Sequence, residues 1–322
     1  MSKRMTTWLV AAAVLIVLGL VLLAVVVAIQ GGDVTVFGAE KYDVHTYEVT
    51  EEFRDISLRT DTAAIVFTVS QDDTCRVVCH ETAKEPHDVT VENGTLTVSA
   101  RNERKWYEYI GIHWGTPAVT VYLPKGEYGA LVVDTDTGAV TIPQGLLFDS
   151  MEIMGDTGVV KNYASVAGTI KIHTDTGAIR VENVTAKAVD LAVTTGAVTV
   201  SDITCEGDVA VQVSTGKAAI SDVTCQNLIS DGDTGDLLLT NVVAKEAFSI
   251  QRSTGDVNLD GCDAAILDIE TDTGDVRGSL LSEKVFLVSS DTGRINVPKT
   301  VTGGRCEIST DTGDIVIAIR ES

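Results

Sequence analysis

Residues 270–276 read ETDTGDV, and the Thr-Gly pair at the centre of this stretch recurs at a constant interval through the second half of the chain. An unbroken series of ten such pairs extends from residue 137 to residue 313, with successive glycines 19 or 20 residues apart. A fixed period of this length is typical of a repeat architecture, in which each repeat forms one structural unit. The glycines of the series are Gly138, Gly158, Gly177, Gly196, Gly216, Gly235, Gly255, Gly274, Gly293 and Gly313.

Apolar residues alternate with other residues on both sides of each glycine. Around Gly274 they stand seven and five positions before it and two positions after it, as Leu267, Ile269 and Val276. The same positions are apolar in nearly every repeat, and Ser230 is an exception five residues before its glycine. An alternation with a period of two predicts a strand on each side of a tight corner.

A repeat this short cannot bury its own apolar face, whereas stacked repeats share one continuous core. Neighbouring strands in such a stack lie about 4.8 Å apart. The sequence therefore predicts an all-β fold for residues 131–322, a parallel β-solenoid of ten coils of 19–20 residues each.

The composition limits the classes of partner. The 322 residues include 46 acidic and 24 basic side chains, for a formal charge of −22. A nucleic-acid partner is not expected, because phosphate binding requires a basic surface. Aromatic residues make up only 5% of the chain.

The N-terminal region carries a separate signal. Residues 8–29 contain no charged side chain. This apolar stretch is long enough to form one transmembrane helix that precedes the solenoid. Because Lys3 and Arg4 stand before this stretch, the positive-inside rule predicts a cytoplasmic tail at 1–7 and a single-pass anchor at 8–29. The domain after it, which begins with a juxtamembrane linker at 30–44, is then expected to lie outside the cell membrane.

Residues 45–130 are predicted to be an irregular β lead-in to the solenoid. SLRTDTAAIVFTV at 57–69 resembles a repeat with Ala63 in place of the corner glycine, and the segments 93–100 and 118–124 have strand patterns. Between the last two lies RNERKWYEYIGIHWGTP, residues 101–117, which breaks the period. We expect a long loop here that covers the end of the solenoid or contacts a partner.

These features together resemble a known family. A short charged N-terminus, one apolar span, a β-rich lead-in that ends in VTVYLPKG at 119–126, and repeated TDTGDV units are similar to the bacterial putative-adhesin family of β-strand-repeat proteins. That family is a membrane-anchored domain of unknown function. The resemblance covers roughly residues 40–322 and implies a β-solenoid on the outside of a bacterial cell, with no catalytic residues to carry over.

The Thr and Gly of each corner are predicted to be structural. Continuing the alternation from the buried positions places the Thr side chain inside the corner, where its hydroxyl could bond the backbone. The Gly would supply a positive φ. Representative corner residues are Thr137, Gly138, Thr176, Gly177, Thr273, Gly274, Thr312 and Gly313.

The acidic residues beside these corners allow two interpretations. Two positions before the glycine, most repeats have Asp and the others have Ser or Thr. All three residue types cap turns through their side-chain oxygens. Stacked carboxylates one position after the glycine could instead hold calcium, and Arg294 would then lie between Asp275 and Asp314. We favour turn capping and expect no cofactor; the weak calcium candidates are Asp233, Asp236, Asp256, Asp272 and Asp275.

The cysteines are expected to be mainly small buried residues. Cys205 and Cys225 stand one coil apart, so they could be free thiols or form a disulfide. Cys75 and Cys79 lie close in sequence to His80 and His87, but their spacing matches no standard zinc pattern.

Two segments are candidates for partner contacts. The aromatic loop combines large rings with basic side chains, as contact surfaces do, and its partner-binding candidates are Trp106, Tyr107, Tyr109 and Trp114. The C-terminal strand could pair with a second molecule if it forms the edge of the solenoid, or it could be covered by loops of the chain itself. The partner would be an envelope protein or a polysaccharide.

An enzyme is not expected, because catalysis requires titratable groups that converge in a pocket and the arginines near the corners are scattered along the chain. The sequence favours an anchored cell-surface structural or interaction protein, adhesin-like and non-enzymatic. The alternative is an accessory protein for envelope-stress sensing or regulation that works through a membrane partner.

Overall fold

The computed structural model describes residues 8, 12–22, 25, 42–82, 85–101 and 117–320. Residues 12–22 are helical. Within the described ranges, no helix is both long enough and apolar enough to cross a membrane. Much of the span predicted at 8–29 lies outside these ranges, as does most of the linker at 30–44.

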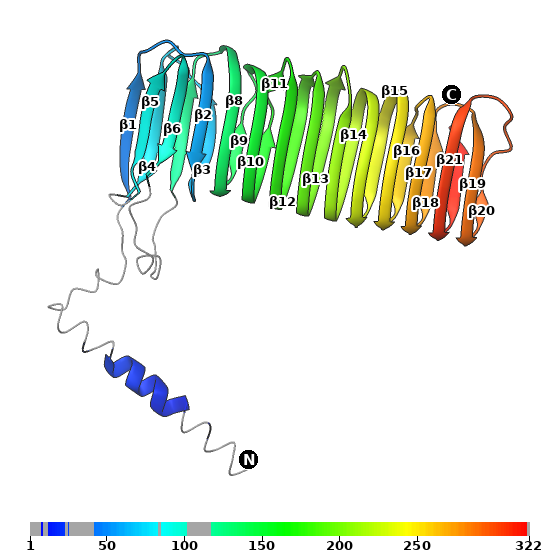
Figure 1. Cartoon of the computed structure of the whole chain (residues 1–322), viewed down its shortest axis with the longest axis horizontal. Helices are drawn as coiled ribbons and strands as arrows, with labels where there is room; N and C mark the ends of the chain where they lie inside the picture. Colours follow the sequence, from blue (N-terminus) through cyan, green and yellow to red (C-terminus); the bar gives the residue numbers. More distant parts are fainter. Residues whose placement is uncertain are drawn as a thin grey trace.

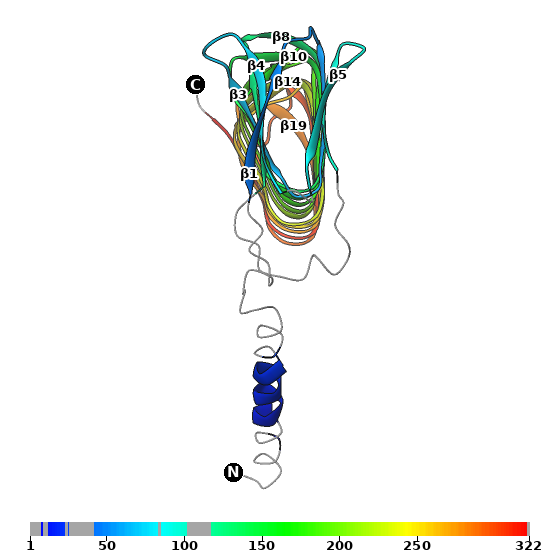
Figure 2. The ribbon, with the colours of Figure 1, turned by 90° about the vertical axis from the view of Figure 1, so that its left-hand side faces the viewer.

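The rest of the described chain is a β-solenoid, which confirms the predicted fold class. Figure 1 shows the strands side by side in one long stack, and Figure 2, turned to view the end of the stack, shows coils that superimpose as a flattened oval. Each coil of the Thr-Gly series has two walls joined by a Thr-Gly corner on one side and a return corner on the other.

The first nine strands build the N-terminal end of the stack, and the remaining strands continue it. The first nine are β1 (Asp43–Val49), β2 (Asp55–Thr60), β3 (Ala64–Val69), β4 (Cys75–Glu81), β5 (His87–Glu92), β6 (Thr95–Ala100), β7 (Ala118–Leu123), β8 (Gly126–Thr137) and β9 (Val140–Ile142). The others are β10 (Leu146–Asn162), β11 (Ser165–Val166), β12 (Thr169–Ala186), β13 (Ala188–Cys205), β14 (Val209–Thr234), β15 (Leu237–Thr254), β16 (Val257–Cys262), β17 (Ile266–Thr273), β18 (Val276–Leu280), β19 (Lys284–Thr292), β20 (Ile295–Asn296), β21 (Gly304–Thr312) and β22 (Ile315–Ile319).

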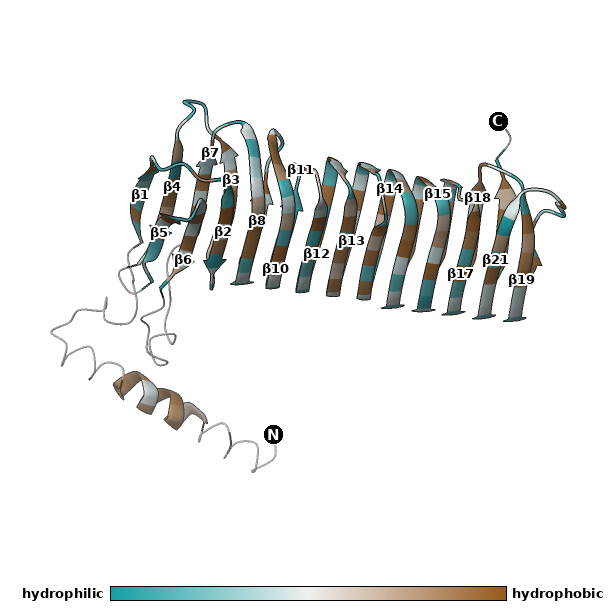
Figure 3. Cartoon of the chain, turned by 45° about the horizontal axis from the view of Figure 1, so that its top comes forward, coloured by the Kyte–Doolittle hydropathy of each residue, from teal (hydrophilic) through white to brown (hydrophobic). Residues whose placement is uncertain are grey.

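Equivalent residues of successive repeats lie beside one another in parallel register. Met151 pairs with Ile170, and Ile170 pairs with Val189. These side chains are at most 1% exposed, and the alternation of apolar and polar residues along each strand is visible in Figure 3. One apolar core therefore runs through the stack, and each coil buries its apolar face against its neighbours.

The lead-in contributes two further coils and an antiparallel cap. Strands β2 and β3 form a coil that pairs in parallel with β8 and β9 on one side and with β6 and β7 on the other. Strands β1, β4 and β5 complete the end through the antiparallel pairs β1–β4, β4–β7 and β5–β6. The first coil of the sequence is thus second in the stack.

At the C-terminal end, as at the N-terminal end, two coils stack in the reverse of their order in the sequence, which the sequence did not predict. Strand β21 pairs with β17 on one side and β19 on the other, and β22 lies between β18 and β20. The last coil of the sequence is therefore inserted one level into the stack. The C-terminal strand is therefore covered rather than at the edge, because β19 and β20 are outermost.

The orientation predicted for the corner threonines is also wrong. The Thr before each glycine is exposed in all ten coils. The alternation of inward and outward side chains continues only as far as the residue three positions before the glycine, and the two residues that follow both point outward. That earlier residue is the one that points inward, and Thr271 and Thr310 at this position donate hydrogen bonds to the carbonyl oxygens of Gly255 (3.3 Å) and Gly274 (3.1 Å). At these two corners the earlier threonine therefore satisfies a backbone carbonyl of the neighbouring corner.

The corner glycines are required mainly by the closeness of the neighbouring coil. A Cβ on Gly216 would lie 1.6 Å from the carbonyl oxygen of Gly196, and Gly216 also has a φ of 139°. Ala63 can replace glycine in the β2–β3 coil because the next coil outward has no Thr-Gly corner; there the chain from Arg101 to Pro117 connects β6 to β7.

The return corner has its own periodic signal, which the sequence analysis missed. Asn and Asp with positive φ stand six residues after four successive corner glycines, and such residues tolerate the left-handed conformation better than most. They are Asn183 (φ 56°), Asp202 (φ 55°), Asp222 (φ 54°) and Asn241 (φ 52°).

We predict that Gly216→Ala destabilises the solenoid, because its Cβ would overlap the Gly196 carbonyl and its φ would be strained. The expected loss in free energy of unfolding is about 2 to 4 kcal/mol, measured by urea unfolding of the full-length chain. Gly126→Ala is the control, since a Cβ there meets no atom within 4 Å. Equal midpoints for the two variants would refute the steric role of the corner glycine.

The order of the C-terminal coils can be tested by cross-linking. Thr312 pairs with both Thr273 and Thr292, so Thr273 and Thr292 lie two levels, about 10 Å, apart. Under mild oxidation, Thr273→Cys/Thr312→Cys should form a disulfide and Thr273→Cys/Thr292→Cys should not. Mass spectrometry of peptides distinguishes them, and the reverse result would show that the coils stack in chain order.

Candidate functional site

The clearest cluster of chemically active side chains lies at the N-terminal end of the stack. Alternation along β4 directs Cys75, Cys79 and Glu81 to the inside, where they are 8%, 0% and 2% exposed. His80, between the last two, is exposed. The sequence analysis considered His80 for a metal site and missed Glu81, although the period of two places Glu81 on the same face as Cys79.

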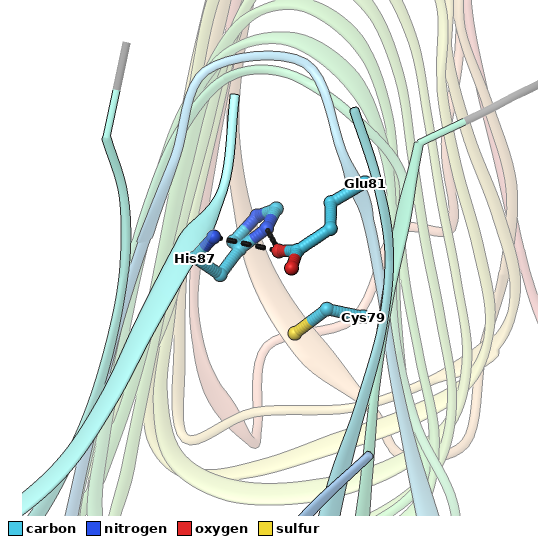
Figure 4. Close-up of side chains that lie close together, drawn as sticks. All are labelled: Cys79, Glu81 and His87. Atoms are coloured by element: carbon cyan, nitrogen blue, oxygen red, sulfur yellow. Dashed lines mark hydrogen bonds and ion pairs between the residues drawn. The ribbon is translucent and has the colours of Figure 1, made fainter. Parts of the chain in front are cut away.

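Glu81 is the centre of a buried hydrogen-bond network. One carboxylate oxygen, Oε2, accepts bonds from the backbone N–H of His87 (2.6 Å) and from its Nδ1 (2.9 Å), two bonds that Figure 4 shows. The other, Oε1, contacts Nδ1 of His45 at 2.5 Å and the hydroxyl of Tyr47 at 3.4 Å. The network joins β1, β4 and β5.

The surroundings shift the pKa values of two groups in this cluster. Burial raises the pKa of Glu81, but the hydrogen bonds from His45 and His87 outweigh it, so the pKa lies below its usual value. Burial, and then the nearby Glu81 carboxylate, raises the pKa of the Cys79 thiol to about 12. A carboxylate and a protonated thiol therefore lie side by side at neutral pH.

The cluster lies close to the two ends of residues 101–117, called the aromatic segment below. A cavity of about 10 Å³ is lined by Glu81 and His87 and by Ala100 and Pro117 at the two ends of that segment. The ends are fixed by hydrogen bonds from Arg101 N–H to Pro86 O (2.8 Å) and from Ala64 N–H to Pro117 O (3.0 Å). Trp106, Tyr107, Tyr109 and Trp114 lie outside the described residues.

The acidic corner ladder has a structural explanation. The side chain of each Asp one position after its glycine accepts a hydrogen bond from the backbone N–H of the equivalent residue in the next coil. The bonds run from Asp256 N–H to Asp236 (3.1 Å), from Asp275 N–H to Asp256 (2.8 Å), from Asp314 N–H to Asp275 (2.7 Å) and from Arg294 N–H to Asp314 (2.9 Å).

The ladder also corrects the predicted place of Arg294. It lies at the end of the row, and Asp314 stands between Asp275 and Arg294. Within the described ranges, the only group of three or more His, Cys, Asp or Glu residues with ligand atoms within 4.8 Å of one another is Cys79, Glu81 and His87. Calcium binding by Asp233, Asp236, Asp256, Asp272 and Asp275 stays a prediction.

Two polar interruptions of the core stripe are explained by local bonds. Ser230 accepts a hydrogen bond from Nη2 of the buried Arg252 (2.6 Å), and Gly232 leaves room for that guanidinium. Burial lowers the pKa of Arg252. Asn162 exchanges two 3.0 Å hydrogen bonds with the backbone of Ala164.

All six cysteines are free and buried. Cys205 and Cys225, for which the sequence left a disulfide open, are thus separate thiols in the structure. Burial raises the pKa of both.

Asp314 gives a testable pH dependence. Hydrogen bonds from the backbone and side chain of Arg294 lower its pKa from the usual 3.8. A depressed folded-state pKa stabilises the fold above the unfolded value, and the stabilisation is lost as the pH falls through the folded value. Asp314→Asn should therefore lower the urea midpoint at pH 7, with a smaller deficit at pH 3.

Asp311→Asn is the matched control, since Asp311 is exposed in the same corner and should leave the midpoint nearly unchanged at both pH values. A deficit for Asp314→Asn that does not change with pH would contradict the assignment.

Comparison with known proteins identifies similar chains. The family model described as Toastrack DUF4097 matches residues 53–212 and 205–322. No curated protein sequence matches this chain significantly.

Three solved structures are similar at low identity. A putative lipid binding protein from Parabacteroides distasonis is 14% identical (TM-score 0.48, covering 73% of this chain and 94% of that one). A putative adhesin from the same species is 12% identical (TM-score 0.45, 87% and 99%). A putative adhesin from Parabacteroides merdae is 11% identical (TM-score 0.46, 87% and 98%).

Proposed function

Because this chain belongs to the Toastrack DUF4097 family, confirming the resemblance inferred from its sequence, we propose that it is a non-enzymatic interaction protein of the bacterial cell surface. The observation that carries the proposal is the repeated outer surface of the solenoid. Ten Thr-Gly coils and two lead-in coils form a stack roughly 50 Å long, at about 4.8 Å per level. Solenoids use such extended surfaces to bind partners.

The corner edge of the stack is polar and repetitive. Exposed threonines recur at every level of the Thr-Gly series, and exposed Asp, or Ser and Thr in their place, precede most of them. With 46 acidic against 24 basic residues in the chain, this surface repels anionic polymers and favours a neutral or basic partner.

Beside this extended surface, we place an adhesin-like binding element in the aromatic segment at the end of the stack. The described residues at its base, Arg101 and Pro117, are held by backbone hydrogen bonds at the end of the stack. These bonds fix the two points from which the segment is presented to a partner. The apolar residues 8–29 would anchor the protein in the cell membrane with the solenoid outside, which suits a protein that meets envelope proteins or polysaccharides.

The proposal is tested by capture from envelope extracts of the source bacterium. The bait is the full-length chain in detergent, compared with a variant in which residues 102–116 are replaced by a Gly-Ser linker of equal length. We expect the wild type to retain a specific envelope protein or polysaccharide that the variant loses. Circular dichroism verifies that the variant keeps its β-structure.

Recovery of the same molecules by both baits would refute the role of the aromatic segment. A control variant with Thr234→Ala and Thr254→Ala, which alters the exposed corner and leaves the segment intact, shows whether the corner edge contributes. If the retained molecule is a membrane regulator, the result favours the sensing alternative.

A further inference from the structure

One nitrogen at the N-terminal end of the stack has no hydrogen-bond partner among the described residues. It is Nε2 of the buried His87, a residue that is only 5% exposed. An unsatisfied buried polar group costs about 1 to 3 kcal/mol. In native proteins such a group calls for an explanation, and an ion or an ordered water is a common one.

The neighbours of His87 supply ligands that suit one class of metal. We propose that Cys79, Glu81 and His87 form a zinc-binding site, with one sulfur, one carboxylate oxygen and one imidazole nitrogen as ligands. Zinc accepts all three ligand types. Calcium and magnesium require mainly oxygen ligands and do not suit a thiolate.

The positions of the three side chains meet the first geometric requirement. Their ligand atoms lie within 4.8 Å of one another, and Figure 4 shows all three side chains at the end of the solenoid, from two facing segments. A tetrahedral zinc ion with bonds of 2.0 to 2.3 Å sets its ligands roughly 3.3 to 3.8 Å apart. Because His87 Nδ1 bonds Glu81 Oε2 at 2.9 Å, zinc binding requires the His87 ring to turn until a ring nitrogen and the carboxylate face the same ion.

The surrounding residues provide the support that a metal site needs. Glu81 is oriented by His45 Nδ1 at 2.5 Å and by the Tyr47 hydroxyl at 3.4 Å. The single proton of the Tyr47 hydroxyl is shared between Glu81 and the carbonyl oxygen of His87, which is the nearer acceptor at 3.1 Å. Hydrogen bonds to ligating residues of this kind fix their orientation and raise metal affinity.

The fourth ligand position is suited to water. The cavity lined by Glu81 and His87 has a volume of about 10 Å³, close to the space that one water needs. Three protein ligands and one water form a typical open zinc site. On binding, the Cys79 thiol releases its proton to solvent, and the thiolate forms the bond to zinc.

The test uses the full-length chain, stripped of metal and then given one equivalent of zinc or cobalt. After removal of free metal, elemental analysis should find about one zinc per chain. The cobalt form should show a thiolate-to-cobalt charge-transfer band in the near ultraviolet. Cys79→Ser should abolish that band, and both Cys79→Ser and His87→Gln should weaken zinc binding at least tenfold.

Cys75→Ser is the matched control, because Cys75 is buried on the same face of β4 but about 13 Å along an extended strand from Cys79. It should keep both the zinc and the cobalt band. A wild-type chain that retains no zinc and shows no band overturns the proposal, and an ordered water would then account for His87. Zinc retained equally by Cys79→Ser and His87→Gln would also overturn it.

Discussion

The structure depends on how closely the backbones of successive coils approach at the Thr-Gly corner. The carbonyl oxygen of one corner glycine occupies the place where a Cβ on the corner glycine of the next coil would stand. A Cβ on Gly216, for example, would lie 1.6 Å from the carbonyl oxygen of Gly196. Only glycine fits at such a contact. Once this residue is fixed, the two walls can stack at strand spacing, and the apolar residues on either side of the corner meet in a common core.

The 19–20-residue period and the alternation of apolar residues were enough to predict the walls of the solenoid, because both can be read from the residues of each repeat. The inward position of Leu267 and Val276 required no knowledge of the neighbouring coils. The threonine orientation was mispredicted because strand alternation was extended into the turn, where the backbone leaves the strand conformation. The return corner could have been found from Asn183 and its three counterparts.

Other features depend on contacts that no single repeat encodes. The order of the last three coils follows from which strand edges meet, and the repeats are too similar for their sequence to specify it. The Glu81 network joins residues 36 and 6 positions apart in the chain, so only the antiparallel cap reveals it. Glu81 itself was visible from the alternation of β4, whereas the contribution of His45 and Tyr47 was not.

The exchange of coil order at both ends has a consequence for how the chain completes its folding. A solenoid stacked in chain order could lose its end coils one at a time, because terminal segments with few neighbours open most readily. Here the β2–β3 coil and the β21–β22 coil are each held between two others, so the last coil cannot peel away alone, whereas β1 pairs with β4 alone. During synthesis, the coil at 284–296 lacks its final partners, β21 and β22, until residues 304–319 have been made. The final order at this end of the stack therefore forms only after those residues are present, and a product truncated before them leaves this end open to proteolysis.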